Sequence, residues 1–347
     1  MTLEVETQIE NWPLDKPFRI TGVTYTEINV VVVTVRVGEF EGRSEAAGVD
    51  YLGESAESMV RQIAAVRPLL AQGVTRAQLQ SKLGIGGARN ALDCALWDLE
   101  AAQSRVPAWR TAGVDALKPR LTTWTIGADD PDSVGQRAAS LTDARAIKLK
   151  LTGDGLDAER VRCARAARPD VWLCVDGNQG FTGASLEALL PTLLAAGVAL
   201  IEQPLPMNGD AELDTIHSPI PLAADESVQG LASIARLNSG YSTINIKLDK
   251  CGGLTEALMM ADAAHARGMG VMVGNMLGTS LAMAPAFVLG QFCDVVDLDG
   301  PLLLARDRLP AATYRDGLVW CPEILWGGAG DAVERSLRAE TQKDWRG

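Results

Sequence analysis

The second half of the chain alternates between short apolar runs and longer stretches with helical spacing. Each run is rich in Val, Ile, Leu and Ala, and in the stretch that follows it apolar residues recur at three- and four-residue intervals. The runs end at nearly regular intervals, at or near Thr125, Lys150, Asp176, Glu202, Asp225, Lys247, Gly274 and Asp297. Eight units, each long enough for one strand and one helix, predict an α/β fold of the (β/α)-barrel type.

A doubly wound open sheet is the alternative for the same alternation of strands and helices. In a barrel, the carboxyl ends of all strands meet around one mouth, where the active site lies. Nearly every predicted strand here ends in Lys, Asp or Glu. A barrel mouth explains so many charged strand ends and an open sheet does not require them, so we predict the barrel.

The first third of the chain has a different pattern and predicts a separate α+β unit. Residues 19–37 are rich in β-branched residues with partial alternation, which predicts one or two strands. Residues 54–72 and 87–104 have the spacing of amphipathic helices. We therefore expect an α+β domain over residues 1–115.

The remaining domain boundaries follow from the length of the chain and from the point at which the repeat of strands and helices ends. A chain of 347 residues is long enough for one large domain or two moderate ones, at roughly 150 residues per domain. We expect the barrel over residues 116–322. Residues 323–347 add no further strand and helix, and we expect them to pack back on the N-terminal domain.

The charge and composition of the chain limit the kinds of binding partner and the cellular compartment that we expect. The chain has 32 Lys and Arg against 44 Asp and Glu, a net charge of −12, which argues against nucleic acid or an anionic membrane as a partner. The uncharged stretch 268–293 is interrupted by Gly, Asn, Pro and Gln, which indicates buried core rather than a membrane span. The acidic start lacks the pattern of a signal peptide, and the six cysteines form no C-x-x-C pair, so we expect reduced thiols and a cytoplasmic location.

Only two histidines are present, which disfavours a His-rich metal site or a Ser-His-Asp triad and leaves carboxylates and lysines for chemistry. Asp176, Glu202 and Asp225 end three consecutive predicted strands, so they should be neighbours on the rim. Three carboxylates that meet would repel one another unless a cation lies between them. Oxygen ligands of this kind favour Mg²⁺, with Mn²⁺ as the alternative. Solvated or ion-paired acids are the competing interpretation.

Lysines follow a matching pattern on opposite sides of the predicted mouth. Lys148 and Lys150 lie two residues apart on the second strand and share a face, whereas Lys247 ends the sixth strand. Four strands apart in a closed eight-stranded barrel means opposite sides, so Lys150 and Lys247 should face each other across a bound substrate. A lysine near a cation or a second lysine loses its proton more easily, from a pKa of about 10.4 toward neutrality, which suits a general base. A structural network that balances the three acids is the alternative.

These motifs together resemble the enolase superfamily, in the muconate lactonizing enzyme subgroup. The resemblance is carried by AIKLK, VDGNQG, LIEQPLP, ADES and NIKLDKCGGLTEA, and by ARNALDCALWDL at residues 88–99, which is similar to the end of that family's capping domain. It implies a modified TIM barrel with an N-terminal α+β capping domain. It also implies that Asp176, Glu202 and Asp225 bind the metal, and that Lys150 and Lys247 are the acid and base.

The resemblance assigns roles to further residues. Lys148 would polarise the substrate carboxylate and lower the pKa of Lys150. Asn178 would support the metal site, and Asp249 would orient or ion-pair a catalytic lysine. In the mobile loop of the capping domain, Arg19 is available to bind a glutamate side chain of the substrate, whereas Gly22 and Tyr25 occupy places where close relatives have Arg.

Within the subgroup, VVDLDGPLL resembles the D-x-D pair with which dipeptide epimerases hold the free α-ammonium of the substrate. Asp297 and Asp299 end the eighth strand, where both side chains could face the mouth, and Thr125 at the end of the first strand is a further candidate for substrate binding. The competing interpretation is an ordinary strand-end turn at Asp299 and Gly300.

The resemblance therefore implies a dipeptide epimerase that inverts the α-carbon of the C-terminal residue by a two-lysine proton transfer. Its substrate would be L-Ala-D/L-Glu, from murein recycling. An o-succinylbenzoate synthase with N-succinylamino acid racemase activity, or a cycloisomerase, is the alternative among enzymes. A catalytically dead barrel that binds metal and ligand is the alternative from another class. The sequence leaves a homo-oligomer open.

Overall fold

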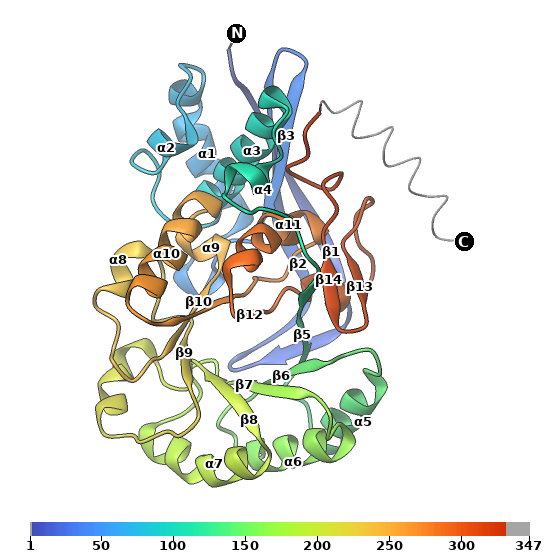
Figure 1. The fold of residues 1–347 in the computed structure, drawn as a ribbon, viewed down its shortest axis with the longest axis vertical. Coiled ribbons are helices and arrows are strands. Elements are labelled where there is room, and N and C mark those ends of the chain that lie inside the picture. Colours follow the sequence, from blue (N-terminus) through green and yellow to red (C-terminus); the bar gives the residue numbers. More distant parts are fainter. Residues whose placement is uncertain (1, 331–347) are drawn as a thin grey trace.

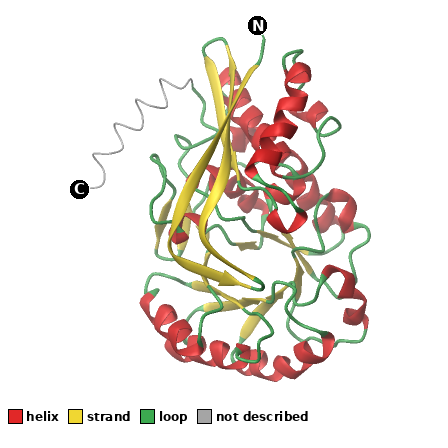
Figure 2. Cartoon of the chain, turned by 180° about the vertical axis from the view of Figure 1, so that it is seen from behind, coloured by secondary structure: helices red, strands yellow, loops and turns green. Residues whose placement is uncertain are grey.

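A computed structural model describes residues 2–330 of the chain. Its N-terminal part is a three-stranded antiparallel sheet of β1 (Glu4–Ile20), β2 (Val23–Val37) and β3 (Phe40–Ala46), in that order. Gly22 has a φ of +77° in the two-residue turn between β1 and β2, a conformation that favours glycine. The two long strands form a hairpin that runs from the far end of this domain down to the barrel (Figure 2).

Helices cover one face of this sheet. They are α1 (Ala56–Leu70), α2 (Arg76–Leu79) and α3 (Gly87–Ser104), followed by the short α4 (Ala108–Thr111). Ser55 caps α1 by accepting a hydrogen bond from the backbone N–H of Ser58. The inward side chains of β2 pack with α1 and α3 in one buried apolar cluster, which includes Val31, Val33, Met59 and Leu92.

The barrel consists of eight parallel strands, as the sequence predicts. They are β5 (Thr123–Ile126), β6 (Ala146–Lys150), β7 (Trp172–Asp176), β8 (Val198–Glu202), β9 (Leu222–Ala224), β10 (Thr243–Ile246), β11 (Gly270–Val273) and β12 (Val295–Val296). Neighbours in sequence are neighbours in the sheet from β5 to β12. Figure 1 shows the strands in chain order around the barrel, with helices on the outside.

Most of the connections between strands contain a helix. The longer ones are α5 (Pro131–Ser140), α6 (Asp157–Ala167), α7 (Gly183–Ala195), α10 (Leu254–Ala266) and α11 (Ser280–Leu289), and the shorter ones are α8 (Leu231–Ile234) and α9 (Leu248–Cys251). The 3₁₀ segments are η1 (Asp50–Leu52), η2 (Met207–Asp214), η3 (Gly290–Phe292) and η4 (Gly300–Leu303). One large apolar cluster joins the strands to these helices and forms the core of the barrel.

The first and last barrel strands meet at a seam without a ladder of paired backbone. Residues just before β5 form β4 (Arg120–Leu121), which turns outward to pair with β14 (Leu318–Trp320), and β14 pairs with β13 (Thr313–Arg315). Side chains bridge the seam instead. Thr123 Oγ1 donates to Asp297 Oδ1 at 2.5 Å, and the N–H of Thr125 donates to Asp299 Oδ2 at 2.5 Å.

The N-terminal domain is fastened over the barrel mouth by buried polar contacts. Thr21, in the hairpin turn, donates to the backbone oxygens of Leu151 and Gly177, each at 3.2 Å. The buried Glu45 carboxylate accepts from the N–H and hydroxyl of Thr279 at 2.8 and 2.6 Å and pairs with Arg308 Nη2 at 2.7 Å. Charged and polar partners of this kind fix the orientation of one domain on the other.

The described end of the chain lies against α3. The Trp326 indole donates to the backbone oxygen of Cys94 at 3.1 Å, and the N–H of Gly327 donates to Asp98 Oδ1 at 2.8 Å. The rest of the segment that we expect to pack there, residues 331–347, lies outside the described residues. Among residues 2–330, no helix is both long and apolar enough to cross a membrane.

Candidate active site

Three carboxylates meet at the mouth of the barrel. Asp176 and Glu202 end the adjacent strands β7 and β8, where they are register partners, and Asp225 follows β9 directly. All three side chains are buried, and each offers an oxygen within 4.8 Å of those of the other two. The strand geometry thus brings together the three acids that the sequence places at consecutive strand ends.

The surroundings of Glu202 indicate that the three carboxylates suit a hard cation. Its Oε1 accepts a hydrogen bond from Asn245 at 2.8 Å, but the buried Oε2 accepts none and makes only an ion pair with Lys148 Nζ at 2.7 Å. Burial, together with the charge of Asp176, raises the pKa of Glu202 to about 8. A divalent cation between the three carboxylates would offset both effects, and an all-oxygen donor set suits Mg²⁺.

Lys148 lies at the centre of the charged groups. Its Nζ is 2.7 Å from Glu202, 2.9 Å from Asp297 and 3.1 Å from Asp176. Burial alone would lower the pKa of Lys148, but the three carboxylates outweigh burial and hold the pKa well above its ordinary value. A permanently charged ammonium at this position can stabilise negative charge on a bound carboxylate.

Lys150 and Lys247 lie at the ends of β6 and after β10, strands that are four positions apart in the barrel, and both line the cavity at its mouth. Lys150 Nζ donates to Asp176 Oδ2 at 2.6 Å, and Lys247 Nζ donates to Asp225 Oδ2 at 2.7 Å. Burial would lower the pKa of Lys247, but the negative charge of Asp225 outweighs burial and raises this pKa. The sequence analysis expects a lowered pKa instead. A cation bound to Asp225 would compete with Lys247 for this carboxylate and so reduce the increase in the pKa of Lys247.

Lys250 is a member of this network that the sequence analysis missed. It is buried on the short helix α9, and its Nζ donates to Asp225 Oδ1 at 2.5 Å and to the backbone oxygen of Asn245 at 3.1 Å. Burial lowers the pKa of Lys250. The two oxygens of Asp225 therefore have different partners, because Lys250 holds Oδ1 and Lys247 holds Oδ2. The sequence signal for Lys250 was its position three residues after Lys247, which places the two lysines on the same helical turn.

Asp297 and Asp299 line the same cavity and also close the barrel seam. Burial opposes ionisation of Asp297, but Lys148 lowers its pKa. Burial and the neighbouring Asp297 raise the pKa of Asp299 to about 7. Thr125 binds Asp299 through both its N–H and, at 3.3 Å, its hydroxyl. The pair thus bridges the barrel seam and lines the cavity at once.

The other predicted residues differ in position. Asn178 lines the cavity, with a φ of +41°, and its N–H donates to Asp176 Oδ1 at 2.9 Å. Asp249 contacts the capping domain, where Oδ1 accepts from the N–H of Gly48 at 2.9 Å, rather than a lysine. Arg19 does not line the cavity, since the alternation of β1 directs Phe18 and Ile20 toward it and Arg19 away, with Nη2 3.9 Å from Asp154.

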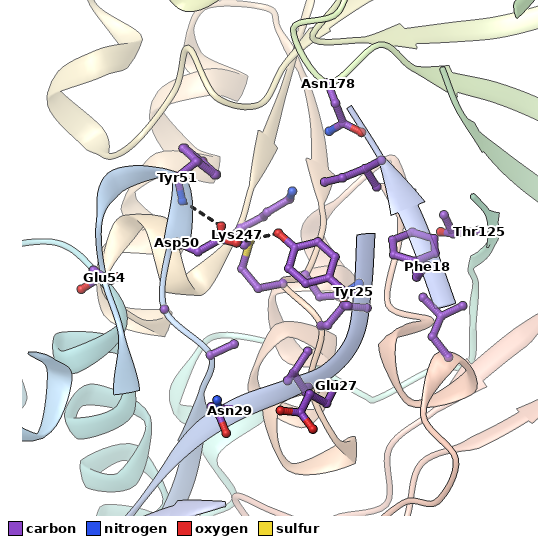
Figure 3. Close-up of a pocket in the computed structure, with 18 of the residues that line it drawn as sticks. Phe18, Tyr25, Glu27, Asn29, Asp50, Tyr51, Glu54, Thr125, Asn178 and Lys247 are labelled. Atoms are coloured by element: carbon purple, nitrogen blue, oxygen red, sulfur yellow. Dashed lines mark hydrogen bonds between the residues drawn. The ribbon is translucent and has the colours of Figure 1, made fainter. Parts of the chain in front are cut away.

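The cavity has a volume of about 350 Å³ and is roofed by the N-terminal domain. Figure 3 shows Phe18 and Tyr25 of the hairpin on one side and Asp50 and Tyr51 of the loop before α1 on the other. Tyr25 Oη donates to Asp50 Oδ2 at 2.6 Å, which links the two segments. Glu226 also lines the cavity, and burial with the charge of the adjacent Asp225 raises its pKa to about 7. The sequence analysis named neither Asp50 nor Glu226.

These features define a class, namely a (β/α)-barrel with a capping domain over its mouth and an acid and lysine network in the enclosed cavity. Two family descriptions match the chain: "Mandelate racemase / muconate lactonizing enzyme, N-terminal domain" over residues 2–113, and "Enolase C-terminal domain-like" over residues 133–330. The chain therefore belongs to the mandelate racemase and muconate lactonizing enzyme family of the enolase superfamily, as its motifs predict.

Named relatives cover almost the whole chain. It is 40% identical to the L-Ala-D/L-Glu epimerase of Escherichia coli K12 over 309 residues, 89% of this chain and 96% of the relative. It is 38% identical to an N-acetyl-D-glutamate racemase of Pseudoalteromonas, over 86% of this chain and 96% of the relative. A crystal structure of an enolase family member from Agrobacterium tumefaciens, with homology to dipeptide epimerases and with bound sodium and L-Ala-L-Glu, superposes with a TM-score of 0.91 at 41% identity. That match covers 94% of this chain and 100% of the other.

Proposed function

We propose that this protein is a divalent-metal-dependent dipeptide epimerase that inverts the α-carbon of the C-terminal residue. The observation that carries the proposal is the position of Lys150 and Lys247 at strand ends four apart in the barrel, where both line one cavity and each donates a hydrogen bond to one of the three carboxylates. A substrate between two such lysines exposes opposite faces of its α-carbon to them. A two-base epimerisation requires this arrangement, because one base removes the proton from one face and the conjugate acid of the other returns a proton to the opposite face.

In this proposal Asp176, Glu202 and Asp225 hold Mg²⁺, or Mn²⁺ in its place. When bound, the metal stabilises negative charge on the substrate carboxylate. Lys148 adds a fixed positive charge next to two of these ligands, at 2.7 Å from Glu202 and 3.1 Å from Asp176. Asn178 supports the metal site through its hydrogen bond to Asp176.

The chain's own lysines carry out the proton transfers. One neutral lysine amine takes the α-proton, and the electron pair of the broken C–H bond moves toward the carboxylate. The opposite lysine, as an ammonium, returns a proton to the other face of the carbon. Each lysine is then the base for one stereoisomer and the acid for the other, and no atoms are gained or lost.

Asp297 and Asp299, with Thr125, would bind the free α-ammonium of the first residue. Their carboxylates are buried and line the cavity, and a buried carboxylate is stabilised by a partner of opposite charge. Asp249 would act as a positioning residue for the capping loop through Gly48.

We propose L-Ala-D/L-Glu as the substrate, and with it a role in the recycling of peptidoglycan peptides in the cytoplasm. The 40% identity to an L-Ala-D/L-Glu epimerase supports this choice. The preference for glutamate rests on the relatives, since Arg19 does not face the cavity. The N-acetyl-D-glutamate racemase makes N-acylated amino acids the competing substrate class. Such substrates lack the ammonium that Asp297 and Asp299 would bind. Assembly of several copies is compatible with the proposal and not required by it.

Deuterium uptake tests the proposal directly. The metal-loaded protein is incubated in D₂O with L-Ala-L-Glu, other free dipeptides and N-acetyl-D-glutamate, and mass and chirality are followed together. We expect one deuterium at the second α-carbon of L-Ala-L-Glu together with inversion, both abolished by EDTA and restored by Mg²⁺. Uptake with N-acetyl-D-glutamate alone would favour the competing class, and turnover by metal-free protein would contradict the proposal.

A further inference from the structure

We propose that Phe18 and Leu303 restrict the first residue of the dipeptide to a small side chain, by closing the catalytic cavity against a second, polar groove. This inference rests on the proposed function, because it assigns a specificity to the same site. The two residues come from different parts of the chain, since Phe18 lies near the end of β1 in the capping domain and Leu303 ends η4 after the last barrel strand.

The second groove lies between the capping hairpin and the outside of the barrel near β5 and α5. Its volume is about 430 Å³. Polar and charged side chains from both domains line it, among them Lys16, Asp129 and Arg137. Three residues line both spaces, namely Phe18, Thr125 and Leu303. They form the wall between the groove and the site of chemistry.

The backbone next to Phe18 is attached to the barrel. The next residue, Arg19, accepts a hydrogen bond through its backbone oxygen from the N–H of Ala128 at 2.9 Å, which ties β1 to the loop after β5. Gly127 lies close to this part of β1, since a Cβ there would be 3.2 Å from the backbone oxygen of Arg19 and 3.4 Å from Phe18 Cδ2. Figure 3 shows the ring beside Thr125 at the edge of the pocket. The place of Phe18 between the two spaces is therefore set by the attachment of β1 to the barrel.

The wall adjoins the part of the cavity that the first residue would occupy. Asp299 accepts hydrogen bonds from both the N–H and the hydroxyl of Thr125, which is itself a wall residue. If Asp299 binds the α-ammonium, the first α-carbon is one bond away from that ammonium and carries the first side chain. That side chain therefore begins next to the wall, and Phe18 and Leu303 set how far it can extend.

Truncation of the wall tests this assignment. We compare kcat/KM for L-Phe-L-Glu with that for L-Ala-L-Glu in the wild type, in Phe18→Ala and in Leu303→Ala. Each truncation should open the cavity toward the groove and raise the ratio of the two values at least about tenfold, the scale on which apolar pockets discriminate side chains by size. Ile20→Ala is the matched control, because Ile20 is the next inward-facing residue of β1 and lines the catalytic cavity but not the groove. Its ratio should stay near that of the wild type.

The outcomes separate this inference from the function on which it rests. If the wild type turns over L-Ala-L-Glu and both truncations leave the ratio unchanged, the wall assignment is wrong and the epimerase proposal stands. An equal rise in Ile20→Ala would also overturn it, since general loosening of the hairpin would then explain the effect. If the wild type exchanges no α-proton in any dipeptide, the proposed function fails and the inference fails with it. Should Phe18→Ala not fold, Leu303→Ala decides the question alone.

Discussion

Asp297 and Asp299 illustrate how single residues here serve the fold and the site together. Both carboxylates accept hydrogen bonds from β5 and so close a seam that lacks backbone pairing. Both also line the cavity. Because the barrel needs only hydrogen-bond acceptors at the seam, an amide oxygen could replace a carboxylate there. Binding of an ammonium, by contrast, depends on the negative charge.

Asp299→Asn separates these two roles. We expect the variant to fold and to lose at least about tenfold in kcat/KM for free dipeptides, because the charge opposite the α-ammonium is gone. Activity toward N-acylated dipeptides, which carry no ammonium, should change little. Steady-state kinetics with L-Ala-L-Glu and its N-acetyl derivative provide the measurement. An equal loss for both substrates would mean that the residue is only structural.

The residues at strand ends were predictable from the sequence because strand periodicity and barrel topology fix where they lie. Asp176, Glu202 and Asp225 are brought together by this topology alone. The partner of Asp249 was not predictable in this way. Asp249 binds Gly48, about two hundred residues earlier, and that contact depends on how the capping domain sits on the barrel. Local patterns carry no information about such a contact.

At the scale of elements, the pattern predicted the buried segments better than the exposed ones. All eight barrel strands were predicted, because most of them are apolar runs that are buried on both faces. Strand β2 and the helices α1 and α3 were also predicted. Most of β1 was missed, since it is an edge strand with largely exposed side chains and weak alternation. The short helix α2 has too few residues to produce a periodic signal.

The loop between β3 and α1 joins the capping domain to the site, and Asp249 of the barrel accepts a hydrogen bond from Gly48 in this loop. Burial raises the pKa of Asp249 from 3.8 to about 7. Between these pH values the folded state binds the proton and the unfolded chain does not. The carboxylate therefore destabilises the fold increasingly as the pH rises through this window, and fully above it.

Asp249→Asn should consequently flatten this pH dependence. The amide oxygen can still accept from Gly48, while the buried charge is removed. We expect the variant to exceed the wild type in stability at pH 8 by about 2–4 kcal/mol, and by clearly less at pH 5. Urea unfolding at the two pH values measures the difference, with the exposed Asp262→Asn on α10 as the matched control. A constant difference between variant and wild type would show that Asp249 does not titrate in this window.

On the scale of the whole molecule, the barrel places two lysines on opposite sides of one covered cavity. Strands β6 and β10 are four positions apart, and the capping domain encloses the space above them. Neither strand alone specifies a function. The central claim is that Lys150 and Lys247 act on opposite faces of the same α-carbon, and it depends on this global arrangement.

The most direct test of that claim is α-proton exchange in D₂O by the single variants Lys150→Ala and Lys247→Ala. Each loses one acid or base, so neither should epimerise L-Ala-L-Glu or L-Ala-D-Glu. Each should still exchange the α-proton of one isomer with retention, through the lysine that remains, and the two variants should act on opposite isomers. Exchange of the same isomer by both variants, or epimerisation at the wild-type rate by either, would contradict the two-lysine account.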